Sequence, residues 1–218
     1  MFDLIGVSKS YKIKGVRKNV LDDVSFSFPK DRNVAIMGPN GVGKSTLMRM
    51  LAGIEAPDRG RIHRSVQVSW PMGFSGGFNG LMTGLENVRF VARLYGADTE
   101  AVIDYVETFA QLGASFRLPI QSYSNGMKSR LALGLSLAVD FDCYLIDEIT
   151  EVGDRAFRAR SKRAFEEKLS RANVVVVSHS ASTIRDYCEC GVLIRDRSLI
   201  YYDAIEDLIG AYEADPQA

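Results

Sequence analysis

A single glycine-rich segment constrains what this chain can fold into more than any other feature. Residues 38–46 read Gly-Pro-Asn-Gly-Val-Gly-Lys-Ser-Thr and match the pattern G-x-x-x-x-G-K-[ST]. The glycines let the backbone bend around an anion with its N–H groups pointing inward. Lys44 then reaches the β- and γ-phosphates of a nucleotide, and the Ser45 hydroxyl binds Mg²⁺. The residues expected to bind there are Gly38, Asn40, Gly41, Gly43, Lys44, Ser45 and Thr46.

The sequence on either side supplies the context that such a loop requires. The apolar run Val34–Met37 precedes it, and a helical apolar pattern follows it from Leu47 to Leu51 and stops at Gly53. A strand, a loop and a helix in this order aim the positive end of the helix at bound phosphates. A glycine-rich structural turn is the alternative, and the flanking pattern argues against it.

Short apolar runs recur along the chain and predict an α/β fold. Four of them are nearly continuous, which is typical of strands buried on both faces of a parallel sheet: Val34–Met37, Val66–Trp70, Cys143–Ile146 and Val174–Val177. Helical patterns lie between these runs. Further elements are expected at Val20–Phe28, in a hairpin of Val192–Arg195 with Leu199–Tyr202, and in a final helix over Ala204–Tyr212.

The middle third of the chain has a different pattern, with no convincing strand from Thr83 to about Val139. Thr83 and Glu86 fit a capping box that begins a helix, and Gly96 is its expected stop. A second helix is expected to close at Gly113, and a third to begin near Ser124. We therefore expect a helical subdomain over roughly residues 80–140, inserted into a core made of residues 1–80 and 140–218.

Two further groups of residues follow predicted strands. Asp147 and Glu148 end the run that begins at Cys143, where Asp147 can hold the Mg²⁺ of a nucleotide and Glu148 can polarise the attacking water. His179 follows the strand that ends at Val177 and can hydrogen-bond a γ-phosphate, although a lone histidine is more often structural. All three are expected at one edge of the sheet, because ligands gather at the carboxyl ends of parallel strands.

The segment from Tyr123 to Met127 opens the third predicted helix. Ser124 is a good N-cap residue, and Gly126 allows a close approach of backbone to a ligand. Two interpretations remain open: a well-capped helix, or a second anion-binding helix terminus on the helical subdomain.

Composition limits which partners this chain is expected to bind and in which kind of compartment it is expected to work. The chain of 218 residues carries 27 Lys and Arg against 27 Asp and Glu, so general attraction to nucleic acid is not expected. Three cysteines favour a reducing compartment, and Cys188 and Cys190 lack the second pair that a zinc site needs. No signal peptide and no stretch of about 18 apolar residues is apparent, so we expect another polypeptide to supply any membrane part.

These elements, in this order, resemble the nucleotide-binding subunit of an ABC transporter over nearly the whole chain. The resemblance implies one ATP-binding domain over residues 1–218: a P-loop NTPase core with an antiparallel β subdomain and an inserted α-helical subdomain. It implies ATP and Mg²⁺ as ligands, with Ser45 and Asp147 on the metal. It also implies Glu148, His179 and Lys44 as catalytic residues. The remaining nucleotide contacts that it implies are Tyr11 stacked on adenine, the signature residues Ser124 and Gly126, and the D-loop residue Asp154. A buried structural role is the alternative for Tyr11.

The chain departs from the family pattern in two places. The signature retains Ser124 and Gly126 but has Tyr123, Asn125 and Met127 where the family has other residues. The family also ends the strand near Trp70 with a glutamine that senses Mg²⁺, and no glutamine follows Gln67 here. Asn79 and Ser75 are the two candidates to replace it.

Short motifs around Trp70, Phe78 and Leu85 are similar to those of ATPases that export capsular polysaccharide in Gram-negative bacteria. That resemblance implies a homodimer that closes on ATP, bound to an integral-membrane exporter subunit at the cytoplasmic face of the inner membrane. It further implies contact through that subunit with periplasmic and outer-membrane export proteins, and no nucleic-acid partner. Trp70, Phe74 and Phe78 are the candidate contacts to the membrane subunit, with core packing as the alternative.

Other functions remain open at this point. An exporter of O-antigen or teichoic acid is the nearest alternative. A soluble ABC-type ATPase acting on ribosomes or in DNA repair, and a non-catalytic regulatory cassette, are the more distant ones.

Overall fold

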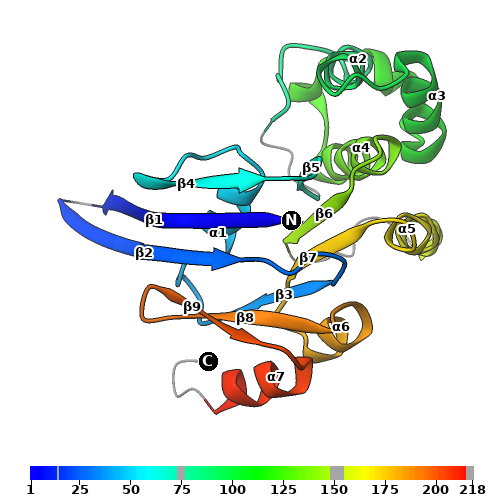
Figure 1. Ribbon diagram of the computed structural model, residues 1–218. Coiled ribbons are helices and arrows are strands. Elements are labelled where there is room, and N and C mark those ends of the chain that lie inside the picture. Colours follow the sequence, from blue (N-terminus) through cyan, green and yellow to red (C-terminus); the bar gives the residue numbers. More distant parts are fainter. Residues whose placement is uncertain (14, 73–76, 148–154, 215–218) are drawn as a thin grey trace. The chain divides into compact units, whose positions relative to one another are not determined.

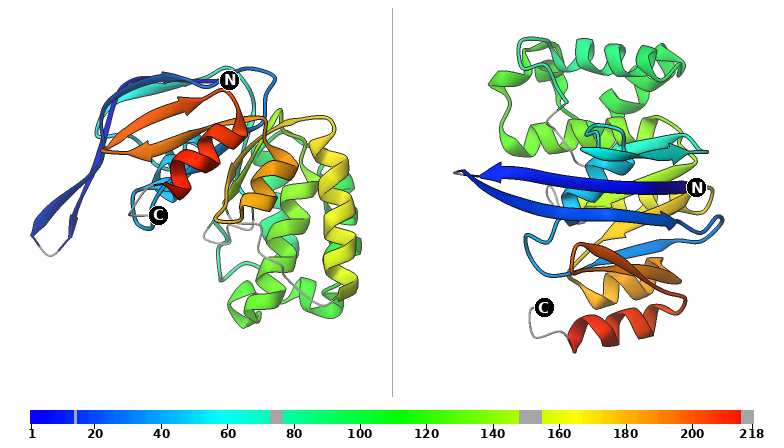
Figure 2. Two further views of the ribbon diagram at one scale, coloured as in Figure 1. Left: turned by 90° about the horizontal axis from the view of Figure 1, so that it is seen from below. Right: turned by 60° about the vertical axis from the view of Figure 1, so that its left-hand side comes forward.

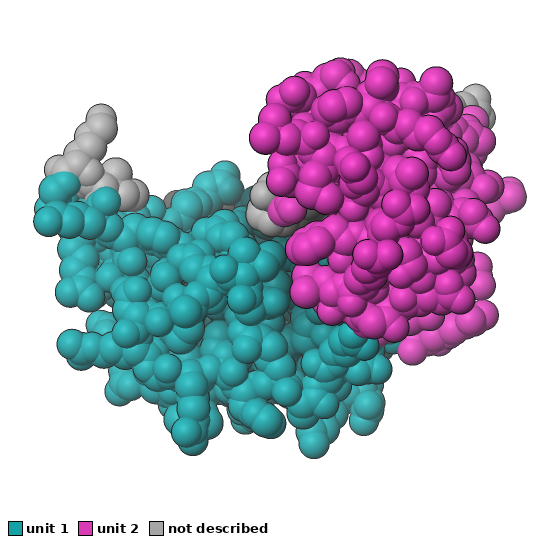
Figure 3. Space-filling model, turned by 90° about the horizontal axis from the view of Figure 1, so that it is seen from above, with its two compact units in different colours: residues 1–71, 142–149, 172–218 teal, residues 72–141, 150–171 magenta. Residues whose placement is uncertain are grey.

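The computed structural model describes residues 1–13, 15–72, 77–147 and 155–214 (Figure 1). The chain divides into two compact units, coloured separately in Figure 3. The first comprises Met1–Pro71, Asp142–Ile149 and Ala172–Ala218, and the second comprises Met72–Phe141 and Thr150–Arg171. The second unit thus contains the segment from 150 to 171 in addition to the helical region expected near residues 80–140.

The first unit contains a three-stranded antiparallel sheet in the order β2-β1-β4. Its strands are β1 (Phe2–Ile13), β2 (Val16–Ser27) and β4 (Arg59–Arg64), and the first two form one long ribbon (Figure 2). The strand expected at Val20–Phe28 is confirmed as part of β2, which begins four residues earlier and ends at Ser27. The strands β1 and β4 were not predicted, because the outer half of β1 is rich in lysine and β4 has a single apolar residue, Ile62.

The second sheet of this unit is mixed and follows the order β5-β6-β7-β3-β8-β9. Its members are β3 (Val34–Met37), β5 (Val68–Pro71), β6 (Cys143–Asp147), β7 (Asn173–Val177), β8 (Cys190–Arg195) and β9 (Ser198–Tyr202). All neighbours pair in parallel except β8 with β9. The predicted parallel sheet is confirmed, since β3 and the β-branched run of β7 are buried on both faces. The strand expected from Val66 begins at Val68 instead.

The hairpin predicted between β8 and β9 is also confirmed. Asp196 and Arg197 occupy its two turn positions with φ of +50° and +63°. Positive φ at both central residues is the geometry that matches the twist of two hairpin strands. The final helix, expected at Ala204–Tyr212, is α7 (Ile205–Glu213).

Helix α1 (Lys44–Leu51) is anchored in the core of the first unit. Leu47, Met48, Met50 and Leu51 are buried in one cluster with apolar residues from both sheets. Burial of each such side chain contributes roughly 1.5–3 kcal/mol to stability. Arg64 of β4 also donates from Nε to the Leu51 carbonyl at 2.7 Å, which satisfies the carboxyl end of the helix. The helix that follows the glycine-rich loop is therefore held along its length.

The second unit is helical in its described residues. It contains α2 (Gly84–Leu94), α3 (Thr99–Ala110), the 3₁₀ turns η1 (Gly113–Arg117) and η2 (Ile120–Ser122), α4 (Asn125–Ala138) and α5 (Arg155–Leu169). Helix α4 packs against both α3 and α5, and Phe109 of α3 meets Phe157 of α5 edge to face. A further helix, α6 (Ala181–Tyr187), belongs to the first unit. Within the described residues, no helix is both long enough and apolar enough to cross a membrane.

The ends of the helices test the capping predictions. The capping box is confirmed: the Thr83 hydroxyl accepts from the Glu86 N–H at 3.1 Å, and the Glu86 carboxylate accepts from the Thr83 N–H at 2.8 Å. The prediction that Gly113 closes the second helix was wrong. Gln111 takes the left-handed conformation (φ +51°) and ends α3, and its N–H returns to the Glu107 carbonyl. Gly113 then begins η1.

Candidate functional site

The glycine-rich loop has a backbone that only glycine tolerates at two of its positions. Gly38 has φ +152°, and a Cβ there would lie 2.9 Å from the Ile194 carbonyl oxygen. Gly43 has φ +124°, and a Cβ there would lie 2.0 Å from Cγ1 of Val20. Both positions are therefore restricted by conformation and by neighbouring atoms. The loop is shaped by packing against β2 and β8.

The amino end of α1 is arranged to receive an anion. Gly43 is its N-cap residue, and no side chain caps the first turn. Backbone N–H groups there are available to a ligand, and the helix dipole adds positive potential. Lys44 is 8% exposed, and its ammonium donates to the Gly38 carbonyl at 2.6 Å and to the Pro39 carbonyl at 3.1 Å. A buried cation thus lies directly against the loop that the pattern predicts to hold phosphates.

The other predicted residues of the first unit lie at the same sheet edge. Strands β3, β7 and β6 are parallel neighbours, so their carboxyl ends face one way. The loop of residues 38–43 follows β3, Asp147 ends β6, and His179 follows β7 by two residues. Ser45 and His179 are exposed to solvent. This edge therefore brings together a cation, a hydroxyl, a carboxylate and an imidazole, whereas Glu148 and Asp154 lie outside the described residues.

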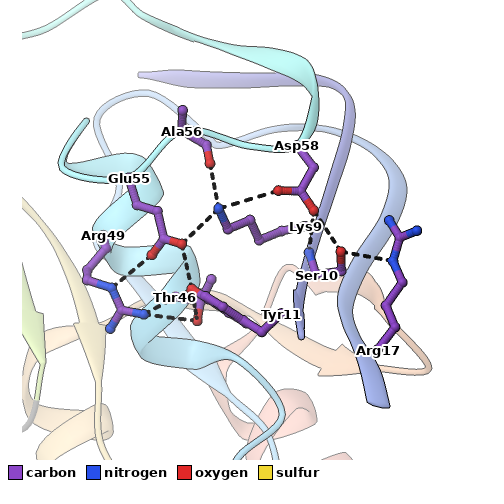
Figure 4. Close-up of polar contacts among 9 residues, drawn as sticks. All are labelled: Lys9, Ser10, Tyr11, Arg17, Thr46, Arg49, Glu55, Ala56 and Asp58. Atoms are coloured by element: carbon purple, nitrogen blue, oxygen red, sulfur yellow. Dashed lines mark hydrogen bonds and ion pairs between the residues drawn. The ribbon is translucent and has the colours of Figure 1, made fainter. Parts of the chain in front are cut away.

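Tyr11 lies near the end of β1 and is bound through its hydroxyl to the phosphate-loop helix (Figure 4). The hydroxyl donates to Glu55 at 2.6 Å and lies 3.2 Å from Oγ1 of Thr46. Arg49 donates to both Tyr11 and Thr46 at 3.2 Å. The ring is half-buried against the core of the unit. Stacking of Tyr11 on adenine stays a prediction.

The charges around Glu55 keep it ionised. Burial raises the pKa of this carboxyl, but hydrogen bonds from Lys9, Tyr11 and Arg49 outweigh that effect and hold its pKa below the usual value. The hydrogen bond to Glu55 in turn raises the pKa of Lys9, whose ammonium lies 2.8 Å from the Glu55 carboxylate. Sequence reasoning missed Glu55 and Arg49. Tyr11 and Glu55 are 44 positions apart in the chain, and no sequence pattern links residues at that distance.

In the second unit, Ser124 and Gly126 form the exposed beginning of α4. The Ser124 hydroxyl accepts from the Met127 N–H at 3.3 Å, which confirms Ser124 as the N-cap residue. A Cβ at Gly126 would meet only Oγ of Ser124, at 3.9 Å. Tyr123 is 5% exposed, and its hydroxyl donates to the Ser115 carbonyl at 2.6 Å. The unusual tyrosine of this motif is thus a buried anchor beneath the helix end.

The candidates to replace the missing glutamine are only partly described. The Asn79 side-chain oxygen accepts from the Leu81 N–H at 3.0 Å. The backbone N–H of Asn79 donates to the side-chain oxygen of Asn87 at 2.9 Å. Asn79 therefore stabilises the turn before α2. Of the aromatic candidates for a partner contact, Trp70 and Phe78 are half-buried. Ser75 and Phe74 lie outside the described residues.

The buried strand β3 leads through a glycine loop into an anchored helix, and a second parallel strand of the same sheet, β6, ends in Asp147. This arrangement defines a P-loop nucleotide-binding protein. The ABC transporter family profile matches residues 21–151. The chain is 42% identical to the polysialic acid transport ATP-binding protein KpsT of Escherichia coli over 99% of this chain and 100% of that protein. It is also 42% identical to the capsule polysaccharide export ATP-binding protein CtrD of Neisseria meningitidis serogroup B, over 98% of this chain and 97% of that protein. The chain belongs to the ABC transporter family.

The fold agrees with that assignment. The dimeric post-hydrolysis structure of the ATP-binding cassette MJ0796, bound to ADP and Pi, matches with a TM-score of 0.73, 21% identity, and coverage of 93% of this chain and 98% of that one. ATP-binding proteins of teichoic acid and O-antigen export match this chain at 30–32% identity. The sequence is thus more similar to the capsule export proteins than to these two groups.

Proposed function

We propose that this chain is the ATP-hydrolysing subunit of an ABC exporter that moves capsular polysaccharide, as a lipid-linked glycan, across the inner membrane. The observation that supports the proposal most is its 41–42% identity to capsule and polysialic acid export proteins over nearly their entire length. Identity to the exporters of teichoic acid and O-antigen is about ten percentage points lower. The phosphate loop supplies the chemistry that such a subunit needs.

The first step is the binding of ATP at the loop. The N–H groups at the start of α1 and the Lys44 ammonium offset the charge of the phosphates. Hydroxyl and carboxylate oxygens are ligands that Mg²⁺ prefers, and exposed Ser45 and half-buried Asp147, at one sheet edge, offer them. When bound, Mg²⁺ neutralises part of the charge on the β- and γ-phosphates. The remaining loop residues, Gly38, Asn40, Gly41, Gly43 and Thr46, shape the cradle.

Hydrolysis then uses residues that follow β6 and β7. Glu148 comes directly after Asp147, and we assign it the role of orienting the attacking water and accepting its proton. His179 is assigned a hydrogen bond to the γ-phosphoryl oxygens as charge shifts toward the leaving group. The water oxygen bonds to the γ-phosphorus as the bond from that phosphorus to the β,γ-bridging oxygen breaks, the proton of the water passes to Glu148, and ADP and inorganic phosphate are the products.

A second copy completes the site in this proposal. Ser124 and Gly126 form an open helix end on the second unit, and we assign them to the nucleotide of a partner copy, with Asp154 at the same interface. A C2 arrangement gives two equivalent sites. The dimeric cassette with the same fold supports this arrangement.

The membrane subunit is proposed to bind at the segment from Pro71 to Thr83 and the adjoining helix. Trp70, Phe74 and Phe78 are the candidate contacts from the sequence. Large apolar side chains are also exposed nearby in the second unit: Leu81 is 76%, Leu94 66% and Phe90 57% exposed. Phe90 and Leu94 are four residues apart on α2 and so lie on one face of that helix, and contiguous exposed apolar surface is typical of interaction sites. Binding there would hold the chain at the cytoplasmic face of the inner membrane and link it to periplasmic and outer-membrane export proteins.

The test is complementation combined with purification. This chain, together with the membrane subunit that pairs with it, would be expressed in a Gram-negative strain that lacks its capsule export ATPase. Surface capsule would then be measured. The pair should co-purify, release phosphate from ATP and restore capsule. Restoration of O-antigen instead of capsule would favour the nearest alternative. Purification with ribosomes or DNA and no membrane subunit would overturn the proposal.

A further inference from the structure

Three side chains of the β1–β2 ribbon contact the phosphate loop or the first turn of α1. The Lys18 ammonium donates to the Gly41 carbonyl at 2.8 Å. Val20 packs against Gly43, where no Cβ can be accommodated. The Tyr11 hydroxyl lies 3.2 Å from Oγ1 of Thr46. The ribbon therefore contacts the loop in its middle, at its end and on the helix that follows.

The register of the ribbon explains why these three residues act together. Tyr11 and Lys18 are directly paired across β1 and β2, and paired residues of an antiparallel ribbon share one face. Between the pairs Lys9–Leu21 and Ser10–Asn19 the register shifts and leaves Val20 unpaired at a β-bulge, and the Val20 side chain lies against Gly43 of the same loop. The ribbon thus presents an ammonium, a hydroxyl and an apolar side chain to the loop and to the helix that follows it.

The hydrogen bonds of Tyr11 have a defined direction. A tyrosine hydroxyl has one proton to donate, and Tyr11 donates it in a hydrogen bond to the Glu55 carboxylate at 2.6 Å. Since Tyr11 then has no proton left for Thr46, the Thr46 hydroxyl is the donor between the two. Arg49 donates to both oxygens, and Lys9 holds Glu55 from β1 (Figure 4). The network fixes the hydroxyl of Thr46 at the start of α1.

We propose that Lys18 and the Tyr11 hydroxyl are positioning residues that hold the phosphate loop in its anion-binding conformation, with Glu55 and Arg49 orienting Tyr11. This inference rests on the proposed function and adds a role to two side chains. Stacking on adenine would involve only the ring of Tyr11, not its hydroxyl. Lys18 lies outside the glycine-loop pattern of residues 38–45, so that pattern assigns it no role. A positioning role acts on the phosphates, so its effect is the same whether or not a nucleobase is present.

The first experiment compares Lys18→Met with Arg17→Met in the full-length chain. Arg17 is the neighbouring cation on β2, and its guanidinium donates to Ser10 instead of the loop. Dissociation constants would be measured for MgATP and for inorganic tripolyphosphate, with thermal unfolding to verify folding. Lys18→Met should weaken both probes by about three- to tenfold, and Arg17→Met by less than about twofold. Equal effects of the two variants would overturn the role of Lys18, because they would show only a general loss of charge.

The second experiment separates the Tyr11 hydroxyl from its ring. Tyr11→Phe keeps the ring and should weaken tripolyphosphate by about threefold or more, with KM for ATP rising while kcat changes less than about twofold. Glu55→Gln should have a smaller effect in the same direction. If Tyr11→Phe binds both probes like the wild type while Tyr11→Ala weakens only ATP, stacking alone explains Tyr11 and the positioning role is wrong.

The outcome for the wild type distinguishes this inference from the proposed function. A wild-type chain that binds both probes but never supports export would overturn the proposed function and leave the positioning role standing. A wild-type chain that binds neither probe would overturn the positioning role itself.

Discussion

The glycine-containing beginnings of α1 and α4 have opposite surroundings. At α1 the N-cap is Gly43, no side chain caps the helix, Val20 and Lys18 contact the loop, and Tyr11 contacts the first turn of the helix. At α4 the N-cap is Ser124, its own hydroxyl binds the Met127 N–H, and Gly126 faces open space. The first has no side-chain cap and is packed against the β1–β2 ribbon, and we propose that it holds the phosphates within one unit. The second is capped by its own serine and has an exposed glycine, and we propose that it completes the site of another copy.

The strongest loss of nucleotide binding is expected from a change at the glycine loop and the start of α1. Lys44→Ala removes the buried ammonium and its charge-assisted hydrogen bonds, so ATP affinity should fall by about 100-fold. Glu148→Gln is the matched variant: it should keep ATP binding and lower the rate of phosphate release by at least about 100-fold. Equilibrium binding and a phosphate-release assay separate the two effects. Unchanged ATP affinity in Lys44→Ala, or substantial turnover in Glu148→Gln, would contradict the assigned roles.

A methyl group added at each glycine tests the difference in surroundings directly. Gly43→Ala places Cβ against Val20 in a strained conformation, so it should cost about 1–3 kcal/mol of stability and abolish ATP binding. Gly126→Ala meets open space and should leave the unfolding temperature unchanged or slightly higher. In the assembled dimer, Gly126→Ala should still lower turnover, on the order of tenfold or more. If Gly126→Ala destabilises the chain as much as Gly43→Ala does, the proposed difference between the packed surroundings of Gly43 and the open surroundings of Gly126 is wrong.

Removal of the cap at α4 should separate stability from binding. Ser124→Ala loses the hydrogen bond to the Met127 N–H and should cost about 1 kcal/mol of stability. Because the proposed phosphate site of the single chain is at α1, in the other unit, the ATP affinity of the single chain should not change. Calorimetry and equilibrium binding on the same preparation check both statements. A loss of ATP affinity in the monomer would show that Ser124 acts within its own chain.

The smallest effect concerns pH and the network around Glu55. The pKa of Glu55 is lowered from its usual value of 4.5, so its stabilising contribution is present above that value and is lost as pH falls through the lower folded-state pKa. Lys9 of β1, Arg49 of α1 and the Tyr11 hydroxyl face this carboxyl, and Asp58 is 3.6 Å from Lys9. The difference in unfolding temperature between wild type and Glu55→Gln should be constant above about pH 5 and shrink below pH 4.5. A difference that is independent of pH would show that Glu55 stabilises the fold without its charge.

Local patterns predicted much of the fold because they report local physics. The buried strands were visible as β-branched runs, and the capping box at Thr83 and Glu86 was visible from its spacing. The end of α3 was not predictable in the same way. Gln111 and Gly113 both lie at the end of the apolar pattern, and Gln111 takes the left-handed conformation just after Phe109 and Ala110, which are buried. Gly113 also takes the left-handed conformation (φ +57°), but it does so two residues later, at the start of η1, after the helix has already ended.

The sequence alone determined the nature of the binding site, because the loop pattern and the apolar strand before it lie within one short stretch of chain. It also placed Asp147 and His179 at the ends of strands that become neighbours in the sheet. Only the tertiary structure decided what surrounds the loop. The contacts of Lys18 with Gly41, and of Tyr11 with Glu55, join residues 23 and 44 positions apart. Such contacts depend on the register of β1 with β2 and on how that ribbon packs beside α1, which no local pattern of residues encodes.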